Sequence, residues 1–220
     1  MIEIIPAIIA KDIDEISQKI SLVEPYVNWV QIDVSDGIFT PNVTWNNPQE
    51  LAPRLRSGQK NILSNIFLEI HLMIKNPAEH IDSWIDSGAK RVIIHVDSGS
   101  NQEEVNAMAK KAKSKDVSFG IALNPEVLVK DIKNLIPIAD VVLLLAVAPG
   151  FSGQEFNESI LEKISHLRKM FPDVIIEIDG GINAAVAKKC VEAGANILVA
   201  ASYIFGAPDI KEAIEVLKEE

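Results

Sequence analysis

Short apolar segments rich in valine and isoleucine alternate along this chain with longer segments in which apolar residues recur at helical spacing. The first pattern is typical of buried parallel strands, and the second of the helices that cover them. We predict eight strands, at Ile2–Ile9, Trp29–Val34, Phe67–Ile74, Arg91–Val96, Val117–Leu123, Val141–Val147, Val174–Ile178 and Asn196–Ala201. A helical pattern follows each strand, for example at Asp12–Glu24, Asn76–Ser87, Gln102–Lys115, Phe156–Met170 and Ala207–Lys218.

Residues with positional preferences mark several of the expected helix ends. Asp12 and Asn76 suit the N-cap, where a short polar side chain accepts a backbone hydrogen bond, and Pro77 suits the first turn. Gly88 and Gly194 stand where helices commonly end in a left-handed residue.

The repetition of one strand-and-helix unit eight times predicts the α/β class and a single (β/α)8 TIM barrel. An open, doubly wound sheet is the second choice. The chain has 220 residues, of which 48% are hydrophobic and 24% charged, enough for one sizeable core and short for two domains. No linker or low-complexity tract interrupts the series, so we expect residues 1–220 to form one domain.

Charge and composition exclude several classes of function. The net charge of −10 argues against a nucleic-acid surface, so an anionic substrate must be held by local backbone donors. No apolar segment reaches membrane-spanning length, and Met1–Pro6 does not have the pattern of a signal peptide, so we expect a cytoplasmic protein. The single cysteine, Cys190, excludes an internal disulfide and a multi-thiolate metal site, and is expected to be a small buried residue on a helix.

Polar residues at the carboxyl ends of the predicted strands are the candidates for chemistry, because reactive groups of such barrels collect there. The strand period of two places Gln31, Asp33 and Ser35 on one face, directed into the barrel mouth. His71 and Asp179 end two other strands in the same way. Burying a carboxylate costs free energy unless it is paired or bound to a cation, so we expect Asp33 and Asp179 to be functional residues of the site. A purely structural role is the alternative.

The histidines and the remaining aspartate of this region have different expected roles. His71 could share a pocket with two carboxylates, which favours metal ligation or substrate contact over packing. For His95 a supporting role, substrate contact and packing stay open, whereas His80 and His166 lie in helical patterns and are expected at the surface or a helix interface. Asp36 precedes Gly37 and is expected to cap a turn.

Glycine-bearing loops after the last three strands provide the second chemical signal. Such loops let backbone N–H groups approach an anion closely, although a glycine pair alone can also mark a tight turn. The residues concerned are Gly150, Phe151, Ser152, Gly153, Gly180, Gly181, Ala201 and Ser202. We expect them to bind the phosphate of a small phosphorylated substrate, and the loop at residues 148–154 to be long enough to close over it.

Several motifs in order resemble those of the ribulose-phosphate 3-epimerases, over essentially the whole chain. They are Pro6-Ala7-Ile8-Ile9, residues 31–37 with Phe39, Pro41-Asn42 and Thr44, His71-Leu72-Met73, residues 149–154, and Asp179-Gly180-Gly181-Ile182. The resemblance implies a metal-assisted 1,1-proton transfer between D-ribulose 5-phosphate and D-xylulose 5-phosphate. In that family one aspartate removes the proton at C3 and the other returns one on the opposite face, which places these roles on Asp33 and Asp179.

The resemblance also implies a divalent ion, with zinc favoured over iron, manganese or cobalt, that stabilises the ene-diolate. Asp33, His71 and Asp179 match the family's ligands, and Gln31 replaces the fourth, a histidine. Other departures from the family pattern are Ala7 for a serine, Ser35 and Leu145 for two methionines, and Ser152 and Ala201 for glycines, whereas Met73 is kept.

Three hypotheses follow. The first is a phosphoketose 3-epimerase, expected to be a homo-oligomer without nucleic-acid or membrane partners. The second is a related phosphosugar isomerase or epimerase with weakened or no metal dependence, in one version a metal-independent epimerase that uses Gln31 as an amide donor. The third is a non-catalytic phosphosugar-binding protein. Related decarboxylases are disfavoured, because they carry an Asp-x-Lys-x-x-Asp array where this chain has residues 69–74, Glu-Ile-His-Leu-Met-Ile.

Overall fold

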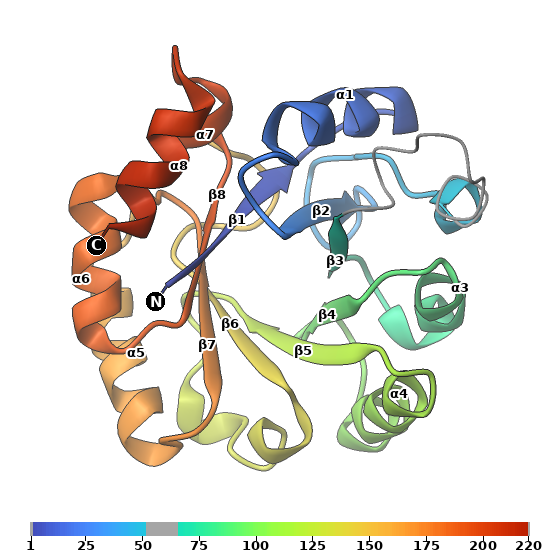
Figure 1. Ribbon diagram of the computed structural model, residues 1–220. Helices are drawn as coiled ribbons and strands as arrows, with labels where there is room; N and C mark the ends of the chain where they lie inside the picture. Colours follow the sequence, from blue (N-terminus) through green and yellow to red (C-terminus); the bar gives the residue numbers. More distant parts are fainter. Residues whose placement is uncertain (1, 52–65, 220) are drawn as a thin grey trace.

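The computed structural model describes residues 2–51 and 66–219. Eight parallel strands pair in chain order and close on themselves, β1 with β8, so the predicted barrel is confirmed and the open doubly wound sheet is wrong (Figure 1). The strands are β1 Glu3–Ile8, β2 Trp29–Ser35, β3 Phe67–Met73, β4 Arg91–His95, β5 Ser118–Leu123, β6 Val141–Leu145, β7 Ile175–Asp179 and β8 Ile197–Ala200.

Helices surround the barrel on the outside (Figure 1). They are α1 Ile13–Val23, α3 Ile81–Asp86, α4 Gln102–Ser114, α5 Ser159–Met170, α6 Ala184–Ala193, α7 Ser202–Phe205 and α8 Ile210–Lys218. Helix α8 packs against β1, α1 and α6, which ties the end of the chain to its beginning. None of the helices in the described ranges is long and apolar enough to cross a membrane.

Several predicted helix ends are confirmed and others are wrong. The Asp12 side chain accepts hydrogen bonds from two backbone N–H groups of α1, and Gly194 ends α6 in the left-handed region. Asn76 makes no such cap, because it is itself left-handed, with φ of 49°, and a 3-10 turn at Pro77–Glu79 separates it from α3. Helix α8 begins at Ile210 rather than near Ala207, because Asp209 caps it through the N–H of Glu212.

The segment between β5 and β6 also departs from the prediction of a helix after every strand. It contains two 3-10 turns, Val129–Asp131 and Ile136–Ile138, in place of an α-helix. Pro125 and Pro137 explain this, because proline lacks the N–H that continues a helix and its ring collides with the preceding turn.

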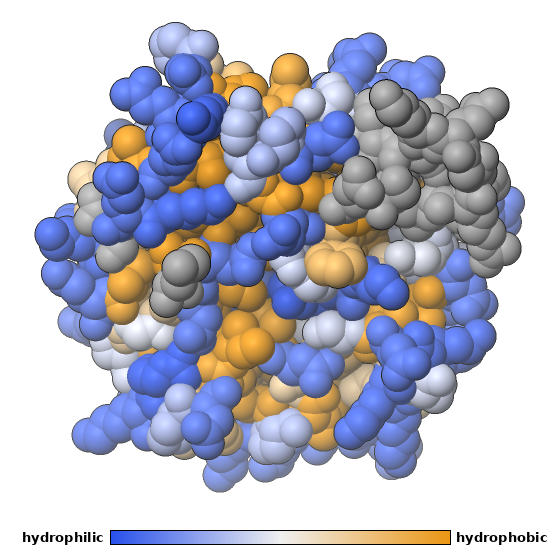
Figure 2. Space-filling model, viewed as in Figure 1, coloured by the Kyte–Doolittle hydropathy of each residue, from blue (hydrophilic) through white to orange (hydrophobic). Residues whose placement is uncertain are grey.

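The main apolar core lies between the strands and the helices, where the outward residues of the strands meet buried helix residues such as Ile16, Ile164 and Cys190. Cys190 is thus buried on a helix, as predicted. One face of the molecule has hydrophilic residues around its rim, with hydrophobic residues exposed between them (Figure 2).

The inside of the barrel is unusually polar. Its apolar side chains form two small clusters, one around Ile5 and Val199 and one around Ile93 and Leu143. The rest of the interior holds buried side chains that carry charge or hydrogen-bonding groups: Gln31, Asp33, Glu69, His71, Arg91, His95 and Glu177. Because burial of such groups is costly unless they are paired, their contacts indicate where the molecule does chemistry.

Candidate active site

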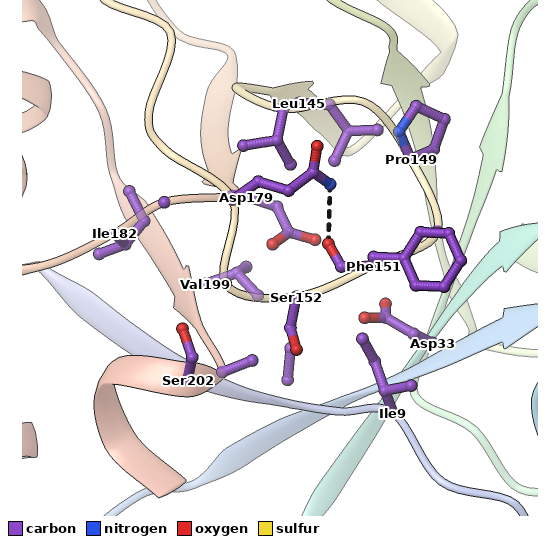
Figure 3. A pocket seen from close by; sticks show the side chains of 18 of the residues that line it. Ile9, Asp33, Leu145, Pro149, Phe151, Ser152, Asp179, Ile182, Val199 and Ser202 are labelled. Atoms are coloured by element: carbon purple, nitrogen blue, oxygen red, sulfur yellow. Dashed lines mark hydrogen bonds between the residues drawn. The ribbon is translucent and has the colours of Figure 1, made fainter. Parts of the chain in front are cut away.

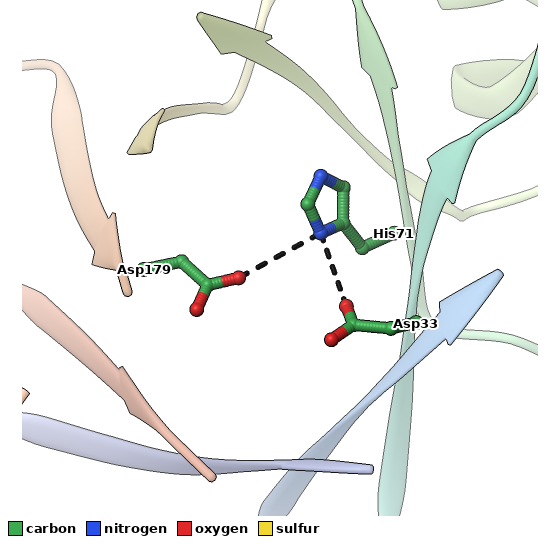
Figure 4. A group of neighbouring side chains, drawn as sticks. All are labelled: Asp33, His71 and Asp179. Atoms are coloured by element: carbon green, nitrogen blue, oxygen red, sulfur yellow. Dashed lines mark hydrogen bonds and ion pairs between the residues drawn. The ribbon is translucent and has the colours of Figure 1, made fainter. Parts of the chain in front are cut away.

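Asp33, His71 and Asp179 meet at the carboxyl end of the barrel (Figure 4). The register of β2 and β3 places Asp33 beside His71, and β7 brings Asp179 from across the interior. His71 Nδ1 lies 3.1 Å from Asp33 Oδ1 and 3.7 Å from Asp179 Oδ2. Both carboxylates are predicted site residues, and the fold brings them together as the sequence predicted.

The amide of Gln31 lies between the two carboxylates. Its Nε2 donates to Asp33 Oδ1 at 2.8 Å and to Asp179 Oδ2 at 2.9 Å, and it is 3.5 Å from His71 Nδ1. The amide oxygen Oε1 is buried and has no hydrogen-bond partner among the described residues. The amide NH2 group therefore neutralises part of the repulsion between two acidic groups that share one site.

Burial and neighbouring charges shift the pKa values of this cluster in opposite directions. Burial, and next the charge of Asp33, raise the pKa of Asp179 to about 7, although His71 and the hydrogen bond from Gln31 oppose the rise. Burial alone would lower the pKa of His71, but its hydrogen bond with Asp33 and the charges of both aspartates outweigh burial and raise it. Two carboxylates so close together cannot both ionise easily, which makes one of them an acid near neutral pH.

His95, whose role the sequence left open, belongs to this cluster. It is fully buried on β4, and its Nε2 lies 2.9 Å from Nε2 of His71. The planes of the two rings are inclined by 20°, and the Phe39 ring also packs against His95, with 4.8 Å between centroids. Burial lowers the pKa of His95 to about 4.

The donor set suits a divalent cation. Ligand atoms of Asp33, His71 and Asp179 lie within 4.8 Å of one another, and two carboxylates with one imidazole are ligands that zinc accepts. The unpartnered Oε1 of Gln31 would supply a fourth ligand atom, since rotating the amide by half a turn would place it between the carboxylates, an arrangement that only a cation there would stabilise. The residues present therefore fit a metal.

A pocket opens above the aspartates (Figure 3). Asp33 and Asp179 line it, together with all the predicted phosphate-binding positions: Gly150, Phe151, Ser152, Gly153, Gly180, Gly181, Ala201 and Ser202. Ala7, Met73 and Leu145 contribute to its wall as well. Gln31, Ser35 and His71 do not line the pocket, because they are buried below its surface.

Gly181 illustrates why the loops that line the pocket need glycine. Its φ is +68°, and a Cβ built there would lie 2.5 Å from the backbone nitrogen of Phe156. Neither the backbone conformation nor the space admits a side chain, so the chain passes the pocket with its N–H and C=O groups uncovered. Glycine in this loop is thus required by geometry, in addition to any role in anion binding.

Polar side chains fix the loop between β6 and α5. Asn42 donates from Nδ2 to the carbonyl of Gly150 at 2.8 Å, and Gln154 donates to the carbonyls of Ala148 and Phe151 at 2.7 and 2.8 Å. These hydrogen bonds hold the exposed Phe151 at the pocket edge. The sequence alone did not predict them. The loop from β2 and the loop from β6 therefore form one rim.

The predictions for Asp36, His80 and His166 are confirmed. The Asp36 carboxylate accepts from the backbone N–H groups of Ile38, Phe39 and Lys75, a turn-capping role. His80 and His166 are exposed.

Sequence reasoning missed a buried charge cluster deeper in the barrel, in which Arg91 Nη1 lies 2.5 Å from Glu69 Oε2 and 3.3 Å from Glu177 Oε2. The strand period could have revealed it, since residues 69, 91 and 177 share the inward parity of His71, His95 and Asp179.

Comparison with known sequences gives a consistent result. The sequence model of the Ribulose-phosphate 3 epimerase family matches residues 3–205. The Ribulose-phosphate 3-epimerase of Chlamydia muridarum (strain MoPn / Nigg) is 39% identical over 205 residues, covering 90% of this chain and 86% of that protein. That of Bacillus subtilis (strain 168) is 33% identical and covers 99% of both chains.

Solved structures show the same fold at low identity. The 3-hexulose-6-phosphate synthase from Salmonella typhimurium has a TM-score of 0.77 at 12% identity, covering 99% of this chain and 97% of that one. KGPDC from Streptococcus mutans has a TM-score of 0.74 at 12% identity, covering 100% of this chain and 96% of that one. At such identities the likeness concerns the barrel alone.

Proposed function

The chain belongs to the ribulose-phosphate 3-epimerase family and is an isomerase, and we propose that it interconverts D-ribulose 5-phosphate and D-xylulose 5-phosphate by proton transfer at C3. The observation that carries the proposal is that Asp33, from β2, and Asp179, from β7, line one pocket although their strands are not neighbours in the barrel. Inversion at one carbon needs a group on each face, because a single base would return the proton to the face it left.

The electrostatics of the pair suit this task. A general acid or base works best when its pKa lies near the working pH, and burial with the neighbouring Asp33 raises the pKa of Asp179 to about 7. Asp33 accepts a hydrogen bond from Gln31 and lies 3.1 Å from His71 Nδ1, so its carboxylate is held in place beside the pocket. In the direction where Asp33 takes the proton, a protonated Asp179 is ready to return one on the other face.

A divalent cation would be held by Asp33, His71 and Asp179, with the amide oxygen of Gln31 as a further ligand. When bound, it supplies the positive charge that makes a proton beside a ketone acidic enough for a carboxylate to remove. Zinc suits this mixed nitrogen and oxygen set, although iron, manganese and cobalt accept it as well.

The phosphate end of the substrate is proposed to lie against the glycine loops. Gly153, Gly181 and Ser202 line the same pocket as the aspartates, so a sugar that spans the pocket reaches both. The net charge of −10 leaves backbone N–H groups as the natural anion donors here. Phe151 and its loop would cover the substrate and exclude water.

The geometry of Gln31 specifically favours one alternative, an epimerase that works without metal. The amide NH2 already bridges Asp33 and Asp179, and a substrate oxygen could accept a hydrogen bond from it. Metal analysis of protein purified without chelator separates the two versions. About one equivalent of bound metal supports the metal-dependent enzyme, and full activity with no bound metal supports the alternative.

The direct test is an epimerase assay on ribulose 5-phosphate with a panel of divalent ions, run on the natural protein and on Gln31→His. Formation of xylulose 5-phosphate by the natural protein is the expected result. A large gain in metal affinity and rate for Gln31→His would show that Gln31 weakens the site. Saturable binding of the substrate without turnover under every ion would favour a non-catalytic binding protein. A cytoplasmic location and a homo-oligomeric state stay predictions.

A further inference from the structure

His71 and His95 share a hydrogen bond that restricts where protons can lie. Their Nε2 atoms are 2.9 Å apart, and both rings are fully buried on neighbouring strands. Two imidazole nitrogens at this distance need one proton between them, because two bare lone pairs repel and two N–H groups collide. One ring must therefore donate from Nε2 and the other must accept there.

Asp97 decides which ring donates. Its Oδ1 lies 3.8 Å from Nδ1 of His95, an atom with no hydrogen-bond partner among the described residues. A carboxylate facing this nitrogen favours a proton on it. The neutral ring of His95 then has a bare Nε2, so it accepts the hydrogen bond, and His71 is the donor.

The position of Asp97 is itself fixed by its surroundings. Its Oδ2 accepts a hydrogen bond from Asn124 Nδ2 at 2.7 Å. Lys163, from α5, holds the Asn124 loop by donating to the carbonyls of Asn124, Pro125 and Val127 at 3.2, 2.6 and 2.8 Å. These contacts place a carboxylate behind His95 even though the Asp97 side chain is 34% exposed.

We propose that His95, held by Asp97, is a positioning residue that fixes the tautomer and orientation of His71. His71 then keeps a proton on Nε2 in every state, so the proton that Asp33 attracts to Nδ1 in the metal-free protein is the one that a bound cation would displace. Nδ1, which faces Asp33 and Asp179, is thereby reserved as the ligand atom. Carboxylate, carbonyl and water partners on the other ring nitrogen orient metal-binding histidines in other proteins in the same way. The consequence for metal affinity rests on the proposed function, whereas the tautomer of His95 does not depend on it.

Packing is the competing explanation, since the His95 ring contacts the rings of both His71 and Phe39. His95→Phe keeps an aromatic ring in this stack and removes both nitrogens. His95→Gln loses the ring but retains a carbonyl oxygen that can accept from His71. Asp97→Asn changes a partly exposed group by one charge and leaves the stack untouched. Asp86→Asn is its control, because Asp86 is an exposed carboxylate on α3 paired with Lys115.

The experiment combines two readouts. Nitrogen-15 NMR of the histidine rings in metal-free protein reports the tautomers, and competition with a chromophoric chelator gives the dissociation constant for zinc. The natural protein should show His95 protonated at Nδ1 and bare at Nε2. Asp97→Asn should give a tautomer mixture and weaken zinc binding by about 10-fold, and His95→Phe by about 10- to 100-fold with partial rescue in His95→Gln.

Two results would overturn the proposal. One is a natural protein with His95 protonated at Nε2 and bare at Nδ1. The other is an Asp97→Asn protein that matches Asp86→Asn in the His95 tautomer. A natural protein that binds no zinc would contradict the proposed metal site, and the tautomer data would still decide the role of His95.

Discussion

Replacing Arg91 by methionine should strongly destabilise the protein. Arg91 is buried inside the barrel, bonded to Glu69 and Glu177, and its guanidinium lies 4.5 Å from the centre of the Trp29 ring. Burial, and next the charge of Glu69, raise the pKa of Glu177 well above its usual range, while Arg91 opposes the rise. Arg91 is the cation that faces both acidic side chains, so Arg91→Met removes the charged partner that Glu69 and Glu177 share.

The magnitude follows from the contacts. Removing one partner of a buried ion pair costs roughly 3–5 kcal/mol, and loss of the contact with Trp29 adds up to about 1 kcal/mol. For a chain of this size a loss of about 4 kcal/mol lowers Tm by roughly 8–16 °C.

Urea denaturation at pH 7, followed by circular dichroism, measures this loss. Glu69→Gln should cost less than Arg91→Met, since Arg91 then keeps Glu177 as an acidic partner at 3.3 Å. The double variant should be more stable than Arg91→Met alone, with a coupling of about 1–3 kcal/mol. A loss below about 1 kcal/mol for Arg91→Met, or additive effects in the double variant, would refute the reasoning.

The remaining predictions concern the pocket. Because burial and the charge of Asp33 raise the pKa of Asp179 to about 7, the folded metal-free protein binds a proton there that the unfolded chain releases near its ordinary value. The stability that this proton contributes is complete below about pH 4 and is lost as the pH rises to about 7. The unfolding free energy of the natural protein, relative to that of Asp179→Asn, should therefore fall over this pH range. A difference between the two proteins that does not change with pH would contradict the prediction. Gly181→Ala should cost more than about 2 kcal/mol, since its Cβ would lie 2.5 Å from the Phe156 backbone, whereas Gly153→Ala, at φ of +79° with open space around it, should cost about 1 kcal/mol. Equal losses of thermal stability in the two alanine variants would show that the contact with Phe156 is not the cause.

The strand period made the position of the two aspartates in the candidate site predictable. Alternation along residues 31–35 directed Asp33 inward, and the same parity, with the glycines that follow, singled out Asp179. Barrel closure then required both to meet at one end, which the structure confirms. His71 followed from its motif and its place on the neighbouring strand.

Contacts across the interior could not be predicted in the same way. The distance between His71 and His95 depends on strand register and ring rotation, and the hydrogen bonds of Gln31 depend on how its amide is turned. Parity shows that Arg91 faces inward, but not that its partners come from β3 and β7. Local backbone choices were also missed, such as the left-handed Asn76, because the same polar residue types serve as caps and as turns.

Hydrogen exchange at C3 of the substrate tests the central claim, that Asp33 and Asp179 exchange protons with one carbon from opposite faces. Ribulose 5-phosphate is incubated in heavy water with the natural protein, Asp33→Asn and Asp179→Asn, with metal content measured in each. The account predicts deuterium at C3, accompanied by epimerisation, for the natural protein, and loss of epimerisation with strongly reduced wash-in for both variants. Unimpaired exchange and epimerisation in either variant would contradict it.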